Sequence, residues 1–276
     1  MAKYSYRDSN YKKRLRSEDE KARKENAKKI AASQKAAEIF FDSSKDIKER
    51  LSVSDDLYTV REENISKALS LFRDYDQPEE LRAVAFSRIA GMVTSSEEIM
   101  QDAIKVIKDR ESSGQLTLIA INALQNASNT ASDTYHACSA DYRDALHIAI
   151  DHSNHQVRET VLESLALSKD AYAQQRLIES LKETAEPLVA PDLAVQFLSY
   201  DLHANHFPVL REVAEKSSDP VAKREAIRNL GSDENSSDLL QKTLADANED
   251  PETRHAAAAA LTSLNPQSSL EASKKI

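Results

Sequence analysis

Apolar and basic positions recur along most of the chain in one short pattern. A residue, most often basic, is followed three positions later by a small or branched apolar residue and four positions after that by Leu or Ile. This spacing places both apolar side chains on one face of a helix. Successive copies begin 35, 41, 33, 32 and 31 residues apart, a period that indicates stacked helical repeats. The six copies are Arg82/Ala85/Ile89, Thr117/Ala120/Leu124, Arg158/Val161/Leu165, Pro191/Ala194/Leu198, Lys223/Ala226/Leu230 and Arg254/Ala257/Leu261.

Each copy predicts the first helix of a helix pair. A turn rich in Asp, Asn, Ser or Pro precedes each copy, as expected for residues that cap a helix or are tolerated in its first turn. The polar stretch from Ala127 to Ala140 lengthens one spacing and is predicted to be a surface loop. The last copy predicts a helix from Pro251 to Leu264 with a short or missing partner. Second helices are expected over residues 97–110, 141–151, 170–184, 206–216 and 236–247.

The segment before the first copy follows a different pattern. Residues 1–14 lack apolar periodicity, which predicts a disordered basic arm. A helix is expected from Leu15 to Phe41, and its second half carries an apolar stripe that we expect to dock onto the body. That stripe is Ala27, Ile30, Ala31, Ala37 and Phe41. The predicted organisation is an arm at 1–14, a charged helix and linker at 15–53, a repeat solenoid at 54–264 and a C-terminal tail at 265–276.

Composition narrows the fold class and the compartment. The chain has 3 Gly, 7 Pro and no Trp, whereas antiparallel sheets need Gly in their turns. The single cysteine, Cys138, excludes an intramolecular disulfide and fits a reducing compartment. No apolar run approaches the roughly 18–20 residues needed to cross a bilayer, and no secretory signal follows the N-terminal charges. We therefore expect a soluble, cytoplasmic, all-α protein.

Charge divides the chain into two parts. Residues 1–35 contain 12 Lys and Arg against 5 Asp and Glu, whereas residues 36–276 contain 25 against 41. The net charge of −9 for the whole chain conceals this division. The sequence predicts a basic N-terminal arm on an acidic body.

The repeats resemble the HEAT-repeat family, in the short variant found in phycobilisome-lyase-type proteins. The resemblance covers about residues 57–264 and implies a right-handed α-solenoid of about six HEAT-like helix pairs, with an N-terminal helical extension. It also implies that the basic residue of each copy bonds across repeats, although Thr117 and Pro191 have lost it. The segments that carry the resemblance are Asp219-Pro220-Val221-Ala222-Lys223-Arg224-Glu225-Ala226, Asp250-Pro251-Glu252-Thr253-Arg254-His255-Ala256-Ala257 and Asn154-His155-Gln156-Val157-Arg158-Glu159.

Some proteins with this architecture are enzymes, and most of their signatures are missing. Deoxyhypusine hydroxylases resemble this fold and bind iron through His-Glu dipeptides, but none of the 7 His here is followed by Glu. HEAT-type DNA glycosylases use a basic groove with aromatics such as Trp, and this body is acidic without Trp. No phosphate-binding glycine loop or nucleophile–His constellation can be argued. A HEAT-type lyase remains an alternative on the repeat type alone. Because the other signatures are missing, we expect no catalytic residue, no cofactor and no small-molecule substrate.

A cluster of four histidines makes a metal site one interpretation of the sequence. His and Cys at close spacing are good zinc ligands, and Cys138 lies among these histidines. Their spacing fits no standard zinc pattern, so exposed turn and loop histidines are the favoured interpretation, and the same holds for His203 and His206. The clustered histidines are His136, His147, His152 and His155.

Two surfaces are candidates for partner binding. In the arm, cations can neutralise phosphates or acidic side chains, and tyrosine rings can stack on unpaired bases. The candidates there are Tyr4, Tyr6, Arg7, Tyr11, Lys12, Lys13, Arg14 and Arg16. On the second helices, acidic residues would suit a basic protein segment. The candidates there are Glu179, Glu183, Glu212 and Glu215.

These features favour a non-enzymatic scaffold or adaptor in an intracellular complex, which binds proteins through its acidic body and its basic arm. The alternative is a nucleic-acid or ribonucleoprotein-associated factor anchored through residues 1–35. A third interpretation is that the arm is solvated and binds no partner. Membrane insertion is not expected, because the arm lacks large aliphatic residues.

Overall fold

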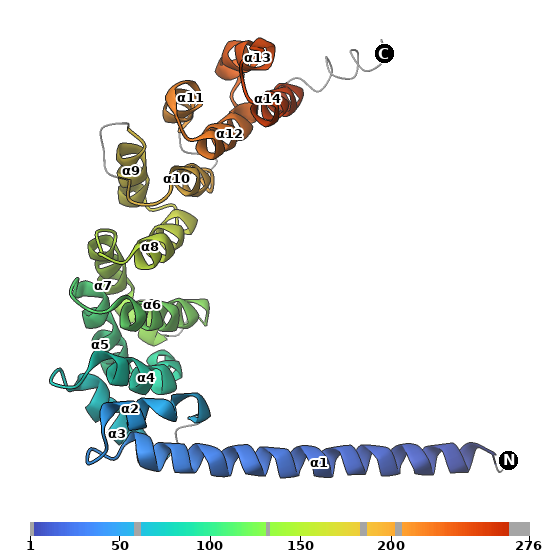
Figure 1. Cartoon of the computed structure of the whole chain (residues 1–276), viewed down its shortest axis with the longest axis vertical. Helices are drawn as coiled ribbons and strands as arrows, with labels where there is room; N and C mark the ends of the chain where they lie inside the picture. The colour runs from blue at the N-terminus through green and yellow to red at the C-terminus, as the bar shows by residue number, and fades with distance from the viewer. Residues whose placement is uncertain (1–2, 58–61, 131–132, 183–186, 202–205, 265–276) are drawn as a thin grey trace. The chain divides into compact units, whose positions relative to one another are not determined.

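The computed structural model describes residues 3–57, 62–130, 133–182, 187–201 and 206–264, with side chains from Asp19 onward (Figure 1). These residues form α-helices, four short 3₁₀ helices and no strand, which confirms the predicted all-α solenoid of repeats. The chain divides into two compact units, Met1–Tyr142 and Arg143–Ile276, and the division falls inside one helix. The two units are described in turn.

Unit 1 is built on a long N-terminal helix and the first helix pairs. Helix α4 packs against α2, α3 and α6, and α5 packs against α6. Phe72 of α3 and Phe86 of α4 are stacked with their ring centroids 4.3 Å apart in the core. Its elements are α1 (Lys3–Phe40), α2 (Ile47–Ser52), η1 (Ser54–Asp56), α3 (Glu62–Arg73), α4 (Glu79–Ile89), η2 (Ala90–Thr94), α5 (Glu97–Lys108), α6 (Gly114–Asn129) and the first part of α7 (Asp133–Ala149).

Unit 2 arranges its helices in two rows (Figure 1). Helices α8, α10, α12 and α14 pack in sequence along one row, and α9, α11 and α13 pack onto them from the other. We name the helices that carry the repeated pattern the A row and their partners the B row, in both units. The elements are the rest of α7, α8 (His155–Leu167), α9 (Ala171–Ser180), α10 (Pro191–Leu198), α11 (Phe207–Lys216), α12 (Pro220–Asn229), η3 (Leu230–Ser232), η4 (Glu234–Ser236), α13 (Ser237–Ala245) and α14 (Pro251–Leu264).

The repeated pattern forms the core of both units, as predicted. Its apolar positions are at most 1% exposed in the first five copies, and only Leu261 of the last copy is half-buried. Small residues at the middle position let neighbouring A helices approach closely. The approach is also close just after α12, because a Cβ at Gly231 of η3 would lie 3.1 Å from the Cα of Ala260 in α14.

Polar caps begin several A helices where the sequence placed them, whereas α4 and α10 follow Pro78 and Ala190 without a side-chain cap. Asn154 Oδ1 accepts hydrogen bonds from the backbone N–H groups of Gln156 and Val157, and Asp219 Oδ1 accepts from Val221 and Ala222. Each cap satisfies donors that have no partner inside the helix. The last A helix runs from Pro251 to Leu264, as predicted.

The predicted surface loop from Ala127 to Ala140 is wrong. Helix α6 continues to Asn129 and α7 already begins at Asp133, so the extra residues lengthen two helices. Ala127 is fully buried and Cys138 is 1% exposed, which ties both helix ends into the core. The segment contains no Gly or Pro, and its Ala and Ser residues are compatible with a helix once apolar side chains can be buried.

Helix α1 begins at Lys3, earlier than the start near Leu15 that the sequence predicted. Residues 1–40 contain neither Gly nor Pro, so the backbone meets no helix breaker. Disorder of residues 1–14 in isolation stays a prediction. Burial begins only at Ser33, so the expected docking of Ala27, Ile30 and Ala31 is wrong, because all three are exposed.

The structure reveals a seventh copy of the pattern that the sequence analysis missed. Arg50, Val53 and Leu57 have the same spacing, and Arg50 lies 32 residues before Arg82. Arg50 is 6% exposed and Leu57 is fully buried. The copy is hard to recognise because α2 ends at Ser52 and its apolar members follow in a turn. The repeats therefore begin inside the segment that the sequence assigned to a linker.

Candidate interaction surfaces

The first candidate surface is the part of α1 that precedes its docked end. All side chains from Asp19 to Ala32 are exposed, and α1 packs against α2 and η1 only through its C-terminal end (Figure 1). Salt bridges one turn apart, Glu20–Lys24 at 2.8 Å and Glu25–Lys29 at 3.6 Å, support the helix along its own surface. Such pairs contribute about 0.2–0.5 kcal/mol each. This stretch, which we name the α1 arm, therefore presents its whole circumference.

The charge of the α1 arm is basic but interleaved. Residues 19–32 contain five basic side chains and three acidic ones. The basic ones are Lys21, Arg23, Lys24, Lys28 and Lys29. The predicted tyrosine and basic candidates from Tyr4 to Arg16 lie on the same helix by their backbone, but their side chains are outside the described part of the structure. Their role in binding stays a prediction.

Polar side chains connect neighbouring B helices in unit 1. Arg73 of α3 lies 2.6 Å from the Asp102 carboxylate of α5, and this hydrogen-bonded pair raises the pKa of the Arg73 guanidinium. Gln101 of α5 donates to Asp141 of α7 at 3.0 Å. Part of the acidic B surface is therefore neutralised by cations of the same surface.

Unit 2 repeats this arrangement. Arg176 of α9 pairs with Asp151 at the end of α7, which raises the pKa of the Arg176 guanidinium. Gln174 of α9 donates to Asp201 at 2.9 Å, and Arg211 of α11 pairs with Asp233. Acidic residues of unit 2 therefore pair with side chains of neighbouring repeats as well as face the solvent.

The predicted acidic candidates do not converge on one point. Glu179 lies on α9 and accepts a hydrogen bond from Gln175 at 2.8 Å. Glu212 lies on α11 and pairs with Lys216 at 3.0 Å, one turn away. Glu215 is exposed on α11, and Glu183 lies outside the described residues. Their assignment to a partner surface stays a prediction.

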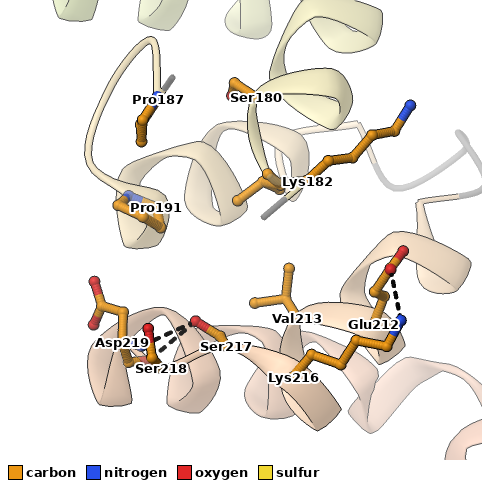
Figure 2. Close-up of a pocket in the computed structure, with 11 residues that line it drawn as sticks. Ser180, Lys182, Pro187, Pro191, Glu212, Val213, Lys216, Ser217, Ser218 and Asp219 are labelled. Atoms are coloured by element: carbon orange, nitrogen blue, oxygen red, sulfur yellow. Dashed lines mark hydrogen bonds and ion pairs between the residues drawn. The ribbon is translucent and has the colours of Figure 1, made fainter. Parts of the chain in front are cut away.

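A pocket of about 350 Å³ lies beside Glu212 in unit 2 (Figure 2). The end of α9 and the turn before α10 form one wall, and α11 with the turn before α12 forms the other. Val213 supplies apolar surface, Lys182 lies on the opposite wall, and the Lys216 ammonium is held by Glu212. The described lining contains no His or Cys, and its charged side chains are Lys182, Glu212, Lys216 and Asp219.

The clustered histidines occupy different environments. His136 and His155 are exposed. His147 Nε2 lies 3.0 Å from Asp170 Oδ1, and His152 is buried with its Nδ1 accepting the Asn154 N–H. Within the residues that the structure describes, no group of three or more His, Cys, Asp or Glu is arranged to hold a metal ion.

Two of these assignments need correction. The sequence predicted exposed turns at His152 and His206, but both are buried, at 1% and 7% exposure. Burial lowers the pKa of His206, which favours its neutral form. Cys138 is also buried, and desolvation raises the pKa of its thiol, which favours the protonated form.

Three of the four basic residues of the predicted copies bond across helices, as the resemblance implied, whereas Arg254 Nε has no hydrogen-bond partner among the described residues. Arg82 Nε donates to the Phe72 carbonyl at 2.9 Å, which satisfies the end of the preceding B helix. Arg158 Nε donates to the Leu188 carbonyl at 2.8 Å, in the turn before the next A helix. Lys223 pairs with Glu249, also ahead of the next A helix. These side chains fasten successive repeats together.

Comparison with known proteins agrees with this construction. Residues 207–272 match the family model described as HEAT repeats, a region that contains α11 to α14. No curated protein matches the chain. None of the described helices is both long enough and apolar enough to span a bilayer. Residues 207–272 therefore match HEAT repeats, and the helix pairs before them share the same repeated pattern.

Proposed function

We propose that the chain is a non-enzymatic scaffold that binds a protein partner through the α1 arm. HEAT repeats generally serve as protein-interaction scaffolds, because stacked helix pairs present extended surfaces. The observation that carries the proposal is the exposure of every side chain from Asp19 to Ala32. A helix without a packed face gains little stability from its own chain, and binding a partner provides that packing.

The charge of the α1 arm favours a protein over nucleic acid. Asp19, Glu20 and Glu25 lie among its basic residues, and carboxylates at these positions oppose the close approach of phosphates. Alternating signs suit a protein surface that carries both charges, where electrostatic complementarity selects the partner. The repeats would then dock a second component, with α9 and α11 the candidate elements.

Affinity purification from the native cell tests the proposal. The α1 variant reverses five charges: Lys21→Glu, Arg23→Glu, Lys24→Glu, Lys28→Glu and Lys29→Glu. The matched control reverses five exposed charges of the repeats outside the pocket beside Glu212 and changes the net charge by the same amount: Lys105→Glu, Arg143→Glu, Lys169→Glu, Arg228→Glu and Lys242→Glu.

We expect the same partner proteins with the wild type and the control, and their loss with the α1 variant. Nuclease treatment should leave the result unchanged. Partners that remain bound to the α1 variant would contradict the proposal, and partners released by nuclease would favour the nucleic-acid alternative.

A further inference from the structure

Two neighbouring repeats of unit 1 hold the same arginine in different surroundings. Arg50 and Arg82 occupy equivalent positions 32 residues apart, and both are buried, at 6% and 3% exposure. Each donates its Nε–H to the carbonyl at the end of the preceding helix, Phe40 at 2.8 Å and Phe72 at 2.9 Å. The two arginines therefore share one structural role. That role does not account for the differences between their surroundings.

The surroundings of Arg82 are closed. The Tyr75 ring covers its guanidinium, with Cζ 4.1 Å from the ring centroid. Glu79 Oε1 lies 3.9 Å from Nη1 and supplies a counter-charge. Stacking and a carboxylate together compensate for the removal of this cation from water.

Arg50 has no equivalent of Tyr75 or Glu79, and the Phe40 ring lies farther from it, with Cζ 5.9 Å from the ring centroid. At the positions equivalent to Tyr75 and Glu79 the chain has Ser43 and Ile47, and the Ile47 side chain is 45% exposed. Nη1 of Arg50 makes only a long contact, 3.4 Å, with Gln77 Oε1. Among the described residues no carboxylate lies within ion-pair distance of Arg50. Hydrogen bonds from Ser44 lower the pKa of the Asp42 carboxyl, and the charge of Arg50 adds to this effect, so Asp42 acts on Arg50 without forming an ion pair. A buried guanidinium without a directly paired carboxylate is costly.

A pocket of about 330 Å³ opens beside Arg50 and Ser43, the position equivalent to Tyr75. Its lining includes Arg50, Ser43 and, from α3, Lys67 and Ser70, with apolar surface from Phe41 and Leu71. Asp74 is the one carboxylate among the lining residues, and the nearby Asp42 carboxylate already accepts two hydrogen bonds from Ser44. Two cations and several hydroxyl donors thus surround a space large enough for a side chain.

We propose that this pocket binds a carboxylate side chain from an acidic segment of a protein partner. A guanidinium presents paired donors that match the two oxygens of a carboxylate, and serine hydroxyls add further donors. Asp42 and Asp74 disfavour a doubly charged phosphate at the same place. Phe41 and Leu71 provide contact for an apolar neighbour of the acidic residue. The inference rests on the proposed scaffold function and names the chemistry of its partner at the base of α1.

The double variant Ser43→Tyr/Ile47→Glu tests the pocket by copying the closed neighbouring repeat. The ring should cover Arg50 and the new carboxylate should pair with it, so the fold is retained and the pocket is filled. The probe is a fluorescein-labelled Glu-Glu-Phe-Glu-Glu peptide, followed by fluorescence anisotropy on the full chain. We expect saturable binding by the wild type and a dissociation constant about tenfold or more higher for the double variant, as for loss of a buried charge pair.

The control is Ser52→Glu, which adds the same charge to exposed α2 outside the pocket and should bind the peptide nearly as well as the wild type. Equal binding by the double variant and the wild type would overturn the assignment, as would equal weakening by Ser52→Glu. A single-stranded oligonucleotide that displaces the peptide and binds more tightly would overturn it as well. If the peptide fails but charge reversal of α1 still releases the cellular partner, the scaffold function stands and only the pocket assignment falls.

Discussion

The α1 arm and the A row are helices of one chain that are stabilised in different ways. In the A row, residues such as Ala226 and Leu230 are fully buried, and tertiary packing determines where each helix lies. In the α1 arm no side chain from Asp19 to Ala32 is buried, and only salt bridges along the helix support it. Burial explains the architecture, whereas exposure is the basis for proposing the α1 arm as a binding surface.

The largest expected effect on the A row comes from removing core volume. Leu230→Ala deletes buried methyl groups from the cluster that joins α12 and α14, and we expect a loss of about 2–5 kcal/mol in the free energy of unfolding. Urea denaturation measures it. The control is Leu244→Ala, because that side chain is 41% exposed and should cost much less. Similar losses for both variants would mean that the A row is not the main core.

A smaller effect is expected from crowding the contact between η3 and helix α14. Gly231→Val should cost about 1–3 kcal/mol, because its Cβ would lie 3.1 Å from Ala260 Cα and 3.3 Å from its carbonyl oxygen. Gly91→Val is the matched control, since nothing lies within 4 Å of a Cβ at that position. Thermal unfolding of the two variants compares them directly, and an unchanged midpoint for Gly231→Val would show that α14 can move aside.

Loss of a helix cap should cost less still. Asp219→Ala removes the acceptor of the Val221 and Ala222 N–H groups at the start of α12, for about 0.5–2 kcal/mol. Glu215→Ala, on the exposed face of α11, should change stability little. Both are measured by urea denaturation, and an effect of Glu215→Ala as large as that of Asp219→Ala would contradict the capping role.

His206 makes a small, pH-dependent contribution. Burial lowers its pKa below the ordinary value of 6.5, so the unfolded chain binds the proton more readily than the folded one. This contribution is present above about pH 6.5 and is lost as pH falls through the lowered pKa. We expect the stability of His206→Gln to decline less than that of the wild type between pH 7 and 5. Parallel declines would show that His206 has no part.

The smallest expected effect on unit stability comes from breaking the α1 arm. Lys24→Pro interrupts the helix, which costs about 3 kcal/mol locally, but no packed neighbour is lost. The urea midpoint should not move, while circular dichroism should show less helix. The same change at Ala226, in the packed α12, should unfold unit 2. A lower midpoint for Lys24→Pro would mean that the arm packs on the body.

Much of the fold could be predicted from the sequence because burial imposes periodicity. The A-row positions and the Pro251–Leu264 helix follow directly from it. The helices around Ala127 and Cys138 were missed because small polar residues tolerate either a loop or a helix, and only tertiary contacts decide. The Arg50 pocket could not be predicted, since it depends on two groups that are missing beside a buried arginine. The sequence contained one signal, namely that Ser43 and Ile47 stand 32 residues before Tyr75 and Glu79, but the burial of Arg50 was needed to interpret it.

Photo-crosslinking in the native cell tests the central claim most directly, namely that the α1 arm is the partner-binding surface. A photoreactive residue replaces Ala27 in the α1 arm or, as control, the exposed Gln241 of α13. We predict that the residue at position 27 gives a specific cross-link to a protein partner and that the residue at position 241 does not. Reversing the five basic charges of the α1 arm should abolish the cross-link from position 27. Cross-links from Ala27 only to the chain itself, or to the same proteins as Gln241, would contradict the account.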